Sequence, residues 1–384
     1  MSLVPDPVAL LDRLVAFESV SHRSVLPIAD FVSDLCDAPK TRIERLPAGD
    51  PEKVNLWLEK GPPAEDGSGL VLCGHLDVVP AGGGWTAPPF RLTDRGDRWL
   101  GRGTCDMKGF LALAIHRFVT LDPDRLSAPL ALLLTCDEEV GSRGAQHLTA
   151  GPDEAPRPRT VWIGEPTDLR VVRLHKGHLR LRVLLEGESG HSAYPDRGRS
   201  AIEPAGPVLV ALTQLRRDLA AERPEDGRHF PEAPFTVLNI GRIEGGEAVN
   251  VVPDRCRIDL GLRLLPGTAA EEIAERVAGT VHGAAPEAVV TIDNLSPPLS
   301  TPETSALHRV LCAELGQRQT AAVSFSSDGG VLSTRGFECV LCGPGSIEVA
   351  HRPDEFLPKA ESDRAAKLLA TVVRSFCQTG GPPS

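Results

Sequence analysis

The sequence predicts an α/β fold: a mostly parallel, helix-flanked sheet that is interrupted by a smaller inserted α+β domain. Strand-length apolar runs alternate with helical segments in the first part of the chain. Near His175 this pattern gives way to the period-two alternation of a half-exposed strand, and it returns toward the C-terminus. The chain has 384 residues, more than a single core usually supports, so we expect two domains.

The first part of the chain supplies the elements of the α/β domain in order. Apolar residues recur at helical spacing over residues 8–17 and 26–35. A buried helix is expected over residues 107–119, and the expected strands are 54–58, 69–75, 130–135 and 161–163. Short apolar runs of this kind are typical of parallel strands that are buried on both faces.

The middle of the chain predicts a strand, a helix, two strands and a second helix. These elements cover residues 179–185, 201–219, 236–243, 257–265 and 269–281. The order suits a small ferredoxin-like domain with one open sheet face. We assign residues 175–285 to this inserted domain and residues 1–174 and 286–384 to the catalytic domain. A strand at 338–342 and a helix at 360–376 complete the latter.

Composition excludes several classes of protein. The formal net charge of −11 leaves no basic stripe for a nucleic acid, so no such partner is expected. No signal-peptide pattern and no apolar run of spanning length is present, so no membrane association is expected. The nine cysteines are scattered, and the Cys339-x-x-Cys342 pair would point to opposite faces of a strand. Structural thiols are favoured over zinc ligands, and a reducing cytoplasmic location is expected.

Histidine and carboxylate side chains stand at the ends of predicted strands. His75 and Asp77 close one strand, Glu138 and Glu139 follow another, and Glu165 follows a third. Charges at such positions are costly unless a metal or a partner compensates them. The carboxyl ends of parallel strands also border the crevice where α/β proteins bind ligands. Together with Asp106 and His351, these residues predict a two-metal hydrolase site.

Each of these residues also has a plainer interpretation. Asp77 shares a face with His75 and could polarise it as an outer support, or it could be a solvated strand end. Asp106 begins a predicted helix and could be its N-cap, although the flexible Gly101–Gly103 segment before it could carry the carboxylate into a cleft. Glu138 and Glu139 could form a solvated loop. Because adjacent side chains diverge, one could instead bind a metal while the other acts as general base.

Histidines far from this set extend the prediction. His351 follows the tight turn at residues 343–346, and alone it could be a surface residue. His191 lies in the segment 189–195 of the inserted domain. It could be an ordinary hairpin histidine, or a hydrogen-bond donor to a developing oxyanion that arrives by domain closure or from another subunit.

Three further residues are candidates for substrate binding. Arg263 interrupts an apolar strand, and with a nearby amide at Asn250 it could capture a substrate carboxylate. A snorkelling strand-edge arginine is the alternative. We also assign Gly345, within the turn before His351, to substrate binding.

The chain resembles the di-zinc aminoacylase/carboxypeptidase/deacylase family and, within it, the acetylornithine deacetylases. The resemblance runs from the first helix to the last. It is carried by Gly-His75-Leu-Asp77, Gly-Arg-Gly-Thr-Cys-Asp106-Met-Lys-Gly, Asp-Glu138-Glu139-Val-Gly, Gly-Glu165-Pro-Thr, Gly-His191-Ser-Ala and Gly-Pro-Gly-Ser…Ala-His351. The segment 326–330, Ser-Ser-Asp-Gly-Gly, departs from the Thr-Glu-Ala-Gly-like stretch of the acetylornithine deacetylases.

The resemblance implies two divalent metal ions, zinc or alternatively cobalt. One would be bound by His75 and Glu165 and the second by Glu139 and His351, with Asp106 bridging both. It implies Glu138 as general base, Asp77 as support for His75, and a lid and homodimerisation role for the inserted domain. The implied substrate is a small Nα-acyl amino acid, N-acetylornithine first. Succinyl-diaminopimelate desuccinylase, dipeptide or glutamate carboxypeptidase, and a non-catalytic metal-binding relative are the alternatives.

Overall fold

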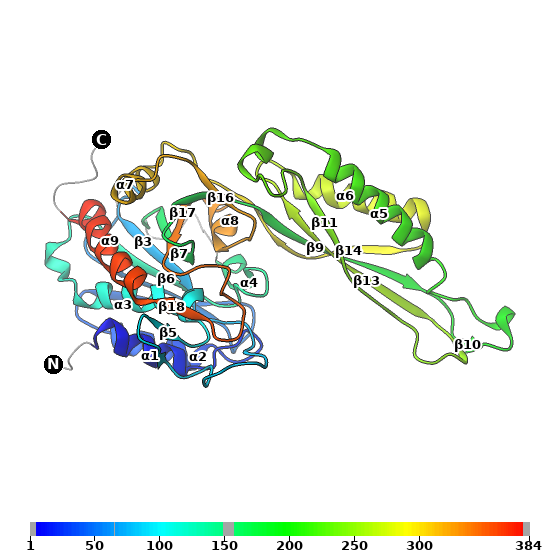
Figure 1. Ribbon diagram of the computed structural model, residues 1–384, viewed down its shortest axis with the longest axis horizontal. Helices are drawn as coiled ribbons and strands as arrows, with labels where there is room; N and C mark the ends of the chain where they lie inside the picture. The colour runs from blue at the N-terminus through cyan, green and yellow to red at the C-terminus, as the bar shows by residue number, and fades with distance from the viewer. Residues whose placement is uncertain (1–4, 65, 149–156, 379–384) are drawn as a thin grey trace. The chain divides into compact units, whose positions relative to one another are not determined.

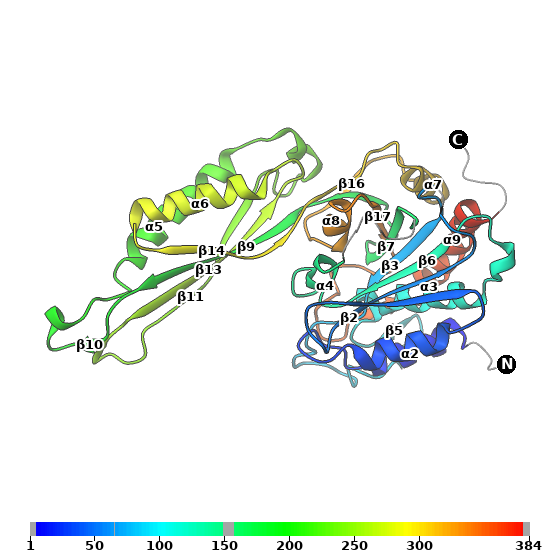
Figure 2. The ribbon, with the colours of Figure 1, turned by 180° about the vertical axis from the view of Figure 1, so that it is seen from behind.

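The computed structural model describes residues 5–64, 66–148 and 157–378. The chain divides into two compact units (Figures 1 and 2). The first comprises residues 1–173, 301–321 and 327–384, and the second comprises residues 174–300 and 322–326. The chain therefore leaves the first unit, builds the second and returns.

The first unit is built on a mixed sheet whose centre is parallel. Its strands follow the order β1 (Thr41–Pro47), β2 (Val54–Lys60), β6 (Leu130–Thr135), β3 (Leu70–His75), β7 (Thr160–Pro166), β17 (Glu338–Gly343) and β8 (Val172–His175). The pairs β6–β3, β3–β7 and β7–β17 are parallel, whereas β1–β2, β2–β6 and β17–β8 are antiparallel. The predicted apolar runs form the centre of this sheet. Strands β3 and β6, which come from two of these runs, are buried along their whole length.

A layer of helices covers one face of this sheet. α1 (Pro7–Ala16), α2 (Leu26–Cys36), α3 (Gly109–Thr120), α7 (Ala306–Leu315) and α9 (Lys359–Cys377) contribute to a common apolar core with alternate strand residues such as Leu70 and Leu72. The short helices α4 (Arg143–Gln146) and α8 (Asp328–Ser333) contact each other and pack on β2 and β17. Small elements complete the unit: β4 (Thr93–Asp94), β5 (Arg98–Leu100), η1 (Thr104–Lys108), η2 (Pro123–Arg125) and β18 (Phe356–Pro358).

The second unit has the ferredoxin-like order of strands and helices. The chain forms β9 (Gly177–Glu186), α5 (Ala205–Ala221), β11 (Val237–Gly245), β13 (Arg255–Leu264), α6 (Ala270–Ala284) and β14 (Val289–Ser296). The antiparallel sheet has the order β11-β13-β9-β14, and α5 and α6 lie on it (Figure 2). Alternate residues of β9 and β13 are buried, as period-two patterning requires.

Short elements extend the second unit or lie at its border. A hairpin pairs β10 (Gly190–His191) with β12 (Val251–Val252). The 3₁₀ turns are η3 (Pro195–Arg197) and η4 (Glu225–His229). Strand β8 crosses the boundary between the units, and β15 (Leu299–Ser300) and β16 (Ala321–Val323) pair with it.

Two details differ from the expectations. The second unit continues to Ser300, not residue 285, because β14 pairs with β9 as a fourth strand. Asp106 is not the N-cap of the following helix: α3 begins at Gly109 with Lys108 as its N-cap. Asp106 instead lies in the irregular η1 turn with φ −120° and ψ 93°, a conformation that points the chain away from helix.

The remaining sequence-based expectations concern membranes and thiols. Over the described ranges, no helix combines the length and the apolar character that a bilayer span requires. Cys339 and Cys342 are both buried free thiols on β17. Neither belongs to the group of potential metal ligands found in the described part of the chain.

Candidate metal centre

The parallel centre of the sheet brings the predicted ligands to one edge. His75 ends β3, Glu165 lies near the end of β7, and Glu138 and Glu139 follow the end of β6. Because β6, β3 and β7 are parallel neighbours, their carboxyl ends meet at the same edge of the sheet. His351 enters from the loop that follows β17, the next parallel strand.

Asp106 lies between two imidazoles. Its Oδ1 is 3.0 Å from Nε2 of His75, and its Oδ2 is 3.2 Å from Nε2 of His351. Nε2 of His351 is also 2.9 Å from Oε2 of Glu139. The potential ligand atoms of His75, Asp106 and Glu139 all lie within 4.8 Å of one another. One carboxylate thus faces a histidine on each side, which is the arrangement a bridging ligand needs.

The imidazole of His75 is oriented by the backbone. Its Nδ1 lies 2.9 Å from the carbonyl oxygen of Asp77, and a carbonyl can only accept, so Nδ1 carries the hydrogen. Nε2 is therefore the nitrogen available to a metal, and it is the one that faces Asp106. His351 adopts a left-handed backbone with φ 61°, which is uncommon for a residue other than glycine and is concentrated at functional sites.

Asp77 acts differently from the expectation. Its carboxylate lies 3.8 Å from Nδ1 of His75, beyond hydrogen-bond distance, so the backbone carbonyl makes that contact. The carboxylate instead accepts hydrogen bonds from the backbone N–H groups of Glu138 and Glu139, at 3.1 and 3.4 Å. The hydroxyl of Ser21 donates to the same carboxylate at 2.7 Å. Asp77 therefore holds the loop that carries the two glutamates.

The carboxylates are packed closely enough to repel one another. Burial, reinforced by Glu165, raises the pKa of Glu138 well above its usual range. Burial and the neighbouring Asp106 likewise raise the pKa of Glu165 and of Glu139. Burial opposes the ionisation of Asp106, but its hydrogen bonds to His351 and His75 outweigh burial and lower its pKa. Several acidic groups therefore share a buried space with two imidazoles.

The donor set fits divalent cations. Oε1 of Glu139 is buried and has no hydrogen-bond partner, so it is an acceptor that a cation could satisfy. The hydrogen bonds to Asp106 and Glu139 raise the pKa of His351 to about 10. A cation bound there would displace that proton because a ligating histidine is neutral. Imidazole and carboxylate ligands suit zinc, cobalt and manganese.

The turn before His351 is tightly packed. Gly345 has φ +89°, and a Cβ there would lie 2.5 Å from Sγ of Cys105, which precedes Asp106. The N–H of Gly345 donates to Glu361 at 2.7 Å. These contacts give Gly345 a structural reason to be glycine. Its expected part in substrate binding stays a prediction.

The remaining candidates lie in the second unit. His191 is exposed in β10, pairs with Val251 and accepts a hydrogen bond from the N–H of Ala193 at 3.1 Å. Asn250 adjoins the other strand of this hairpin, and its carbonyl accepts from Ser192. Arg263 stands near the opposite end of β13, where its guanidinium lies 3.4 Å from the hydroxyl of Ser326.

Asn250 and Arg263 are not neighbours within one copy of the chain. Strand β13 starts at Arg255, close in sequence to the hairpin, and Arg263 lies eight residues further along it. At about 3.3 Å per residue, these eight residues place Arg263 roughly 26 Å from Arg255, which is at the hairpin end of β13. The expectation that one guanidinium and a nearby amide form a joint carboxylate clamp is therefore wrong for a single copy.

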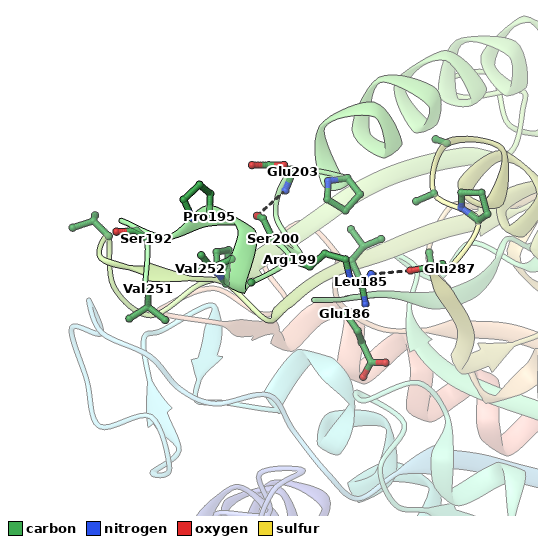
Figure 3. A pocket seen from close by; sticks show the side chains of 18 residues that line it. Leu185, Glu186, Ser192, Pro195, Arg199, Ser200, Glu203, Val251, Val252 and Glu287 are labelled. Atoms are coloured by element: carbon green, nitrogen blue, oxygen red, sulfur yellow. Dashed lines mark hydrogen bonds and ion pairs between the residues drawn. The ribbon is translucent and has the colours of Figure 1, made fainter. Parts of the chain in front are cut away.

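A cavity of about 910 Å³ also lies in the second unit, beside the β10–β12 hairpin (Figure 3). Ser192, Pro195 and Val252 contribute to its lining, as does Arg199, which forms an ion pair with Glu287 at 2.7 Å. His191, Asn250 and Arg263 are not among the lining residues. We therefore assign this cavity no part in the chemistry of the metal centre.

Sequence reasoning did not single out three buried charged residues around the site. Burial raises the pKa of Asp328 to about 6, and its Oδ2 accepts a hydrogen bond from Thr135 at 2.6 Å. Arg102 and Glu355 form a buried ion pair at 2.6 Å. The only signal for Asp328 was the departure of segment 326–330 from the deacetylase pattern. Arg102 and Glu355 depend on a contact between residues 253 positions apart.

Comparison with known proteins identifies the family of this chain. The model of "Peptidase family M20/M25/M40" matches residues 71–375, most of the chain. The chain belongs to this family. It is therefore a hydrolytic enzyme that acts on amide bonds.

Three proteins illustrate the similarity. Acetylornithine deacetylase of Myxococcus xanthus is 37% identical over 383 residues, which cover 96% of this chain and 97% of the relative. The metallo-carboxypeptidase Sso-CP2 of Sulfolobus solfataricus has a TM-score of 0.75 at 17% identity, with 96% and 99% covered. The YXEP protein of Bacillus subtilis, described as a dinuclear metal binding peptidase, has a TM-score of 0.66 at 16% identity, with 96% of each chain covered.

Proposed function

We propose that this enzyme is a metal-dependent deacylase that releases the acyl group from the Nα of an amino acid, with N-acetylornithine as its substrate. The observation that carries the proposal is the position of Asp106 between His75 and His351, with buried glutamates alongside. The choice of substrate rests on similarity to the acetylornithine deacetylase of Myxococcus xanthus over nearly the whole chain.

Two divalent ions would be held by five side chains. His75 and Glu165 would bind one ion, Glu139 and His351 the other, and Asp106 both. Zinc is the first candidate, and cobalt would also suit these ligands. When bound, such ions polarise a carbonyl group and lower the pKa of water toward neutrality.

Glu138 is proposed as the general base. It would take a proton from the attacking water and deliver it to the leaving amine. A carboxylate serves this purpose best when its pKa approaches the working pH, and burial beside Glu165 raises the pKa of Glu138 in that direction. Asp77 supports the assignment because its carboxylate holds the backbone of Glu138. A protein that only binds metal needs no such base.

The second unit is proposed to act as lid and homodimerisation module. His191 is exposed on a hairpin, where its imidazole could reach a reacting group on closure or from a second copy. It would donate a hydrogen bond to the oxygen that gains charge in the transition state. Arg263, Asn250 and Gly345 are proposed to bind the substrate, with Arg263 directed at its α-carboxylate.

A second candidate activity rests on segment 326–330. Its Ser-Ser-Asp-Gly-Gly sequence departs from the stretch expected of acetylornithine deacetylases, and Asp328 is buried close enough to interact with His75 and Asp77. Removal of a succinyl group from succinyl-diaminopimelate, or cleavage of a dipeptide or a C-terminal glutamate, uses the same chemistry on a different substrate.

A substrate panel tests the proposal. The protein is stripped of metal, reconstituted with Zn²⁺ or Co²⁺, and assayed on N-acetylornithine, other Nα-acetyl amino acids, succinyl-diaminopimelate and dipeptides. We expect the highest kcat/KM for N-acetylornithine. A preference for the succinyl compound or a dipeptide would replace the substrate assignment, and a lack of hydrolysis of any of these would overturn the activity.

A further inference from the structure

A buried ion pair lies beneath the predicted metal centre. Nη1 of Arg102 lies 2.6 Å from Oε2 of Glu355, and each side chain is 1% exposed. Replacing a buried ion pair with apolar side chains often leaves a protein equally stable or more stable. Stability alone is therefore a weak reason for this pair, and its contacts suggest a more specific one.

The carboxylate of Glu355 fixes the segment that carries Asp106. Its Oε1 accepts hydrogen bonds from the backbone N–H groups of Cys105 and Asp106, at 2.9 and 3.0 Å. The carbonyl of Glu355 accepts from the N–H of Gly101 at 3.0 Å. Because η1 is irregular, its N–H groups depend on such partners instead of on a regular helical ladder.

The guanidinium of Arg102 reaches a second segment. Its Nη2 lies 3.3 Å from the carbonyl oxygens of both Pro80 and Ala81. Pro80 follows Asp77 by three residues, so these bonds fix the chain just beyond His75 and Asp77. The guanidinium also lies 5.1 Å from the ring of Trp85. A planar fork can make all these contacts at once, whereas an ammonium is a point donor.

The ion pair is also linked to the segment that carries His351, because Glu355 lies on that segment. Glu355 follows His351 by four residues, and the neighbouring Asp354 accepts a hydrogen bond from the N–H of Thr86 at 2.8 Å. The segments that carry His75, Asp106 and His351 are therefore joined through one salt bridge. These are three of the five predicted ligands.

We propose that Arg102 and Glu355 are positioning residues that set the geometry of the metal centre by joining its three ligand-bearing segments. The inference rests on the proposed metal centre. Neither side chain touches a ligand side chain in the contacts above, so their effect passes through the backbone. Loss of the fork should relax the spacing of the ligands and weaken the hold on the metal.

The test compares two equivalent lysine substitutions. Arg102→Lys keeps the charge and loses the fork. Arg157→Lys is the matched control, because Arg157 pairs with Glu44 at 2.8 Å and lies 4.5 Å from the ring of Trp57. Zn²⁺ affinity is measured by competition with a chromophoric chelator, and the visible spectrum of the Co²⁺ form reports ligand geometry. Glu355→Gln is the second variant, since it keeps an acceptor for the two N–H groups but not the charge.

We expect Arg102→Lys and Glu355→Gln to lower Zn²⁺ affinity about 10–100-fold and to alter the Co²⁺ spectrum, the usual effect of losing an outer-shell contact. Arg157→Lys should leave both unchanged. Wild-type affinity and spectrum in Arg102→Lys would overturn the inference, as would an equal loss in the control. If Glu355→Gln does not fold, the two lysine variants decide. A wild-type protein that takes up no metal would instead refute the metal centre itself.

Discussion

Asp106 connects both halves of the predicted site through a single carboxylate. Its two oxygens face His75 and His351, and its backbone is held by Glu355. The bonds to the two histidines outweigh burial and keep its pKa low, so the group is ionised at neutral pH. Glu138 and Glu165 have the opposite shift because burial dominates. Within one site, the surroundings thus lower the pKa of one carboxylate and raise the pKa of two others.

Glu138→Gln should separate catalysis from metal binding. The amide has nearly the same shape, so both ions should still bind, but it cannot accept the proton. We expect kcat to fall by about 10²–10⁴-fold, the usual contribution of a positioned general base. Steady-state kinetics on the acetylated substrate and elemental analysis of the same sample check this. Near-normal turnover in the variant would mean that another group is the base.

His351 should make metal binding depend on pH. Its pKa of about 10 in the folded protein lies above the ordinary histidine pKa of about 6.5. Its protonated form therefore stabilises the metal-free fold fully below about pH 6.5, and this contribution is lost as the pH rises toward 10. Since a metal must displace this proton, the protonation of His351 should by itself contribute a rise in Zn²⁺ affinity of about tenfold per pH unit between pH 6.5 and 8. Chelator competition at several pH values measures the slope.

The control for this prediction is His351→Ala. The variant lacks the titrating group, so its metal content should be lower and its affinity should depend less on pH. A slope equal to that of the wild type would assign the pH dependence to another ligand, with His75 as the first alternative.

His191 and Arg263 should affect different kinetic parameters. His191→Ala removes a donor that acts chiefly in the transition state, so kcat should fall by about 10²–10³-fold while metal content stays unchanged. Arg263→Ala should mainly raise KM for substrates with a free α-carboxylate. Kinetics on free and amidated substrates check both. An unchanged kcat in His191→Ala would mean that the second unit takes no direct part in the chemistry. An equal change in KM for both substrates would mean that Arg263 has a structural role and does not bind the α-carboxylate.

The sequence located the predicted ligands because they share a simple position. His75, Glu139 and Glu165 are at or just beyond the ends of apolar strands, and a parallel sheet gathers such ends. Arg102 and Glu355 could not be located this way, since their role depends on a contact between distant segments. The sequence placed Asp77 beside His75, but it did not show whether the carboxylate or the backbone carbonyl of Asp77 contacts the imidazole. Backbone geometry decides this, and the carbonyl makes the contact.

At the scale of elements, apolar patterning was sufficient to locate a strand wherever both of its faces are buried. Strands β3 and β6 lie where uninterrupted apolar runs predicted them. Strand β14 was missed because it is only partly buried, with no clear alternation of exposed and buried residues. Its register also shifts between Ile292 and Asn294, and it carries Asp293 and Asn294. Period-two patterning is weak in such an edge strand. The inserted unit therefore extends further than the pattern indicated.

The packing of α3 on β7 offers a test at this scale. A Cβ at Gly164 would lie 1.9 Å from the ring of Phe110, in the buried face of α3. Gly164→Ala should therefore destabilise the protein by about 1–3 kcal/mol through overpacking. Gly83→Ala is the control, since nothing lies within 4 Å of a Cβ there. Urea unfolding compares the two midpoints, and equal midpoints would mean that α3 moves aside without strain.

At the scale of the whole molecule, each unit has a large apolar core of its own among the described residues. One belongs to the sheet with α1, α2, α3, α7 and α9, and the other to the sheet with α5 and α6. The predicted metal ligands all belong to the first unit, whereas His191, Asn250 and Arg263 belong to the second. A ligand stabilises only the structure that it binds, so metal should affect the two units unequally.

Hydrogen exchange with and without metal tests this difference. Chelation should abolish activity, and added Zn²⁺ or Co²⁺ should restore it. Zn²⁺ at 100 times its dissociation constant should stabilise the first unit by about 2.7 kcal/mol for each ion bound. Amides of β3, β6 and β7 that exchange through opening of this unit should slow accordingly, by about 100-fold for each ion, because 1.4 kcal/mol corresponds to tenfold. Amides of β9 and β13 serve as the internal control and should exchange at the same rate in both states. Equal slowing in both sets of amides would show that the two units open together. In the activity assay, full activity of a sample that elemental analysis shows to be free of metal would refute the metal mechanism.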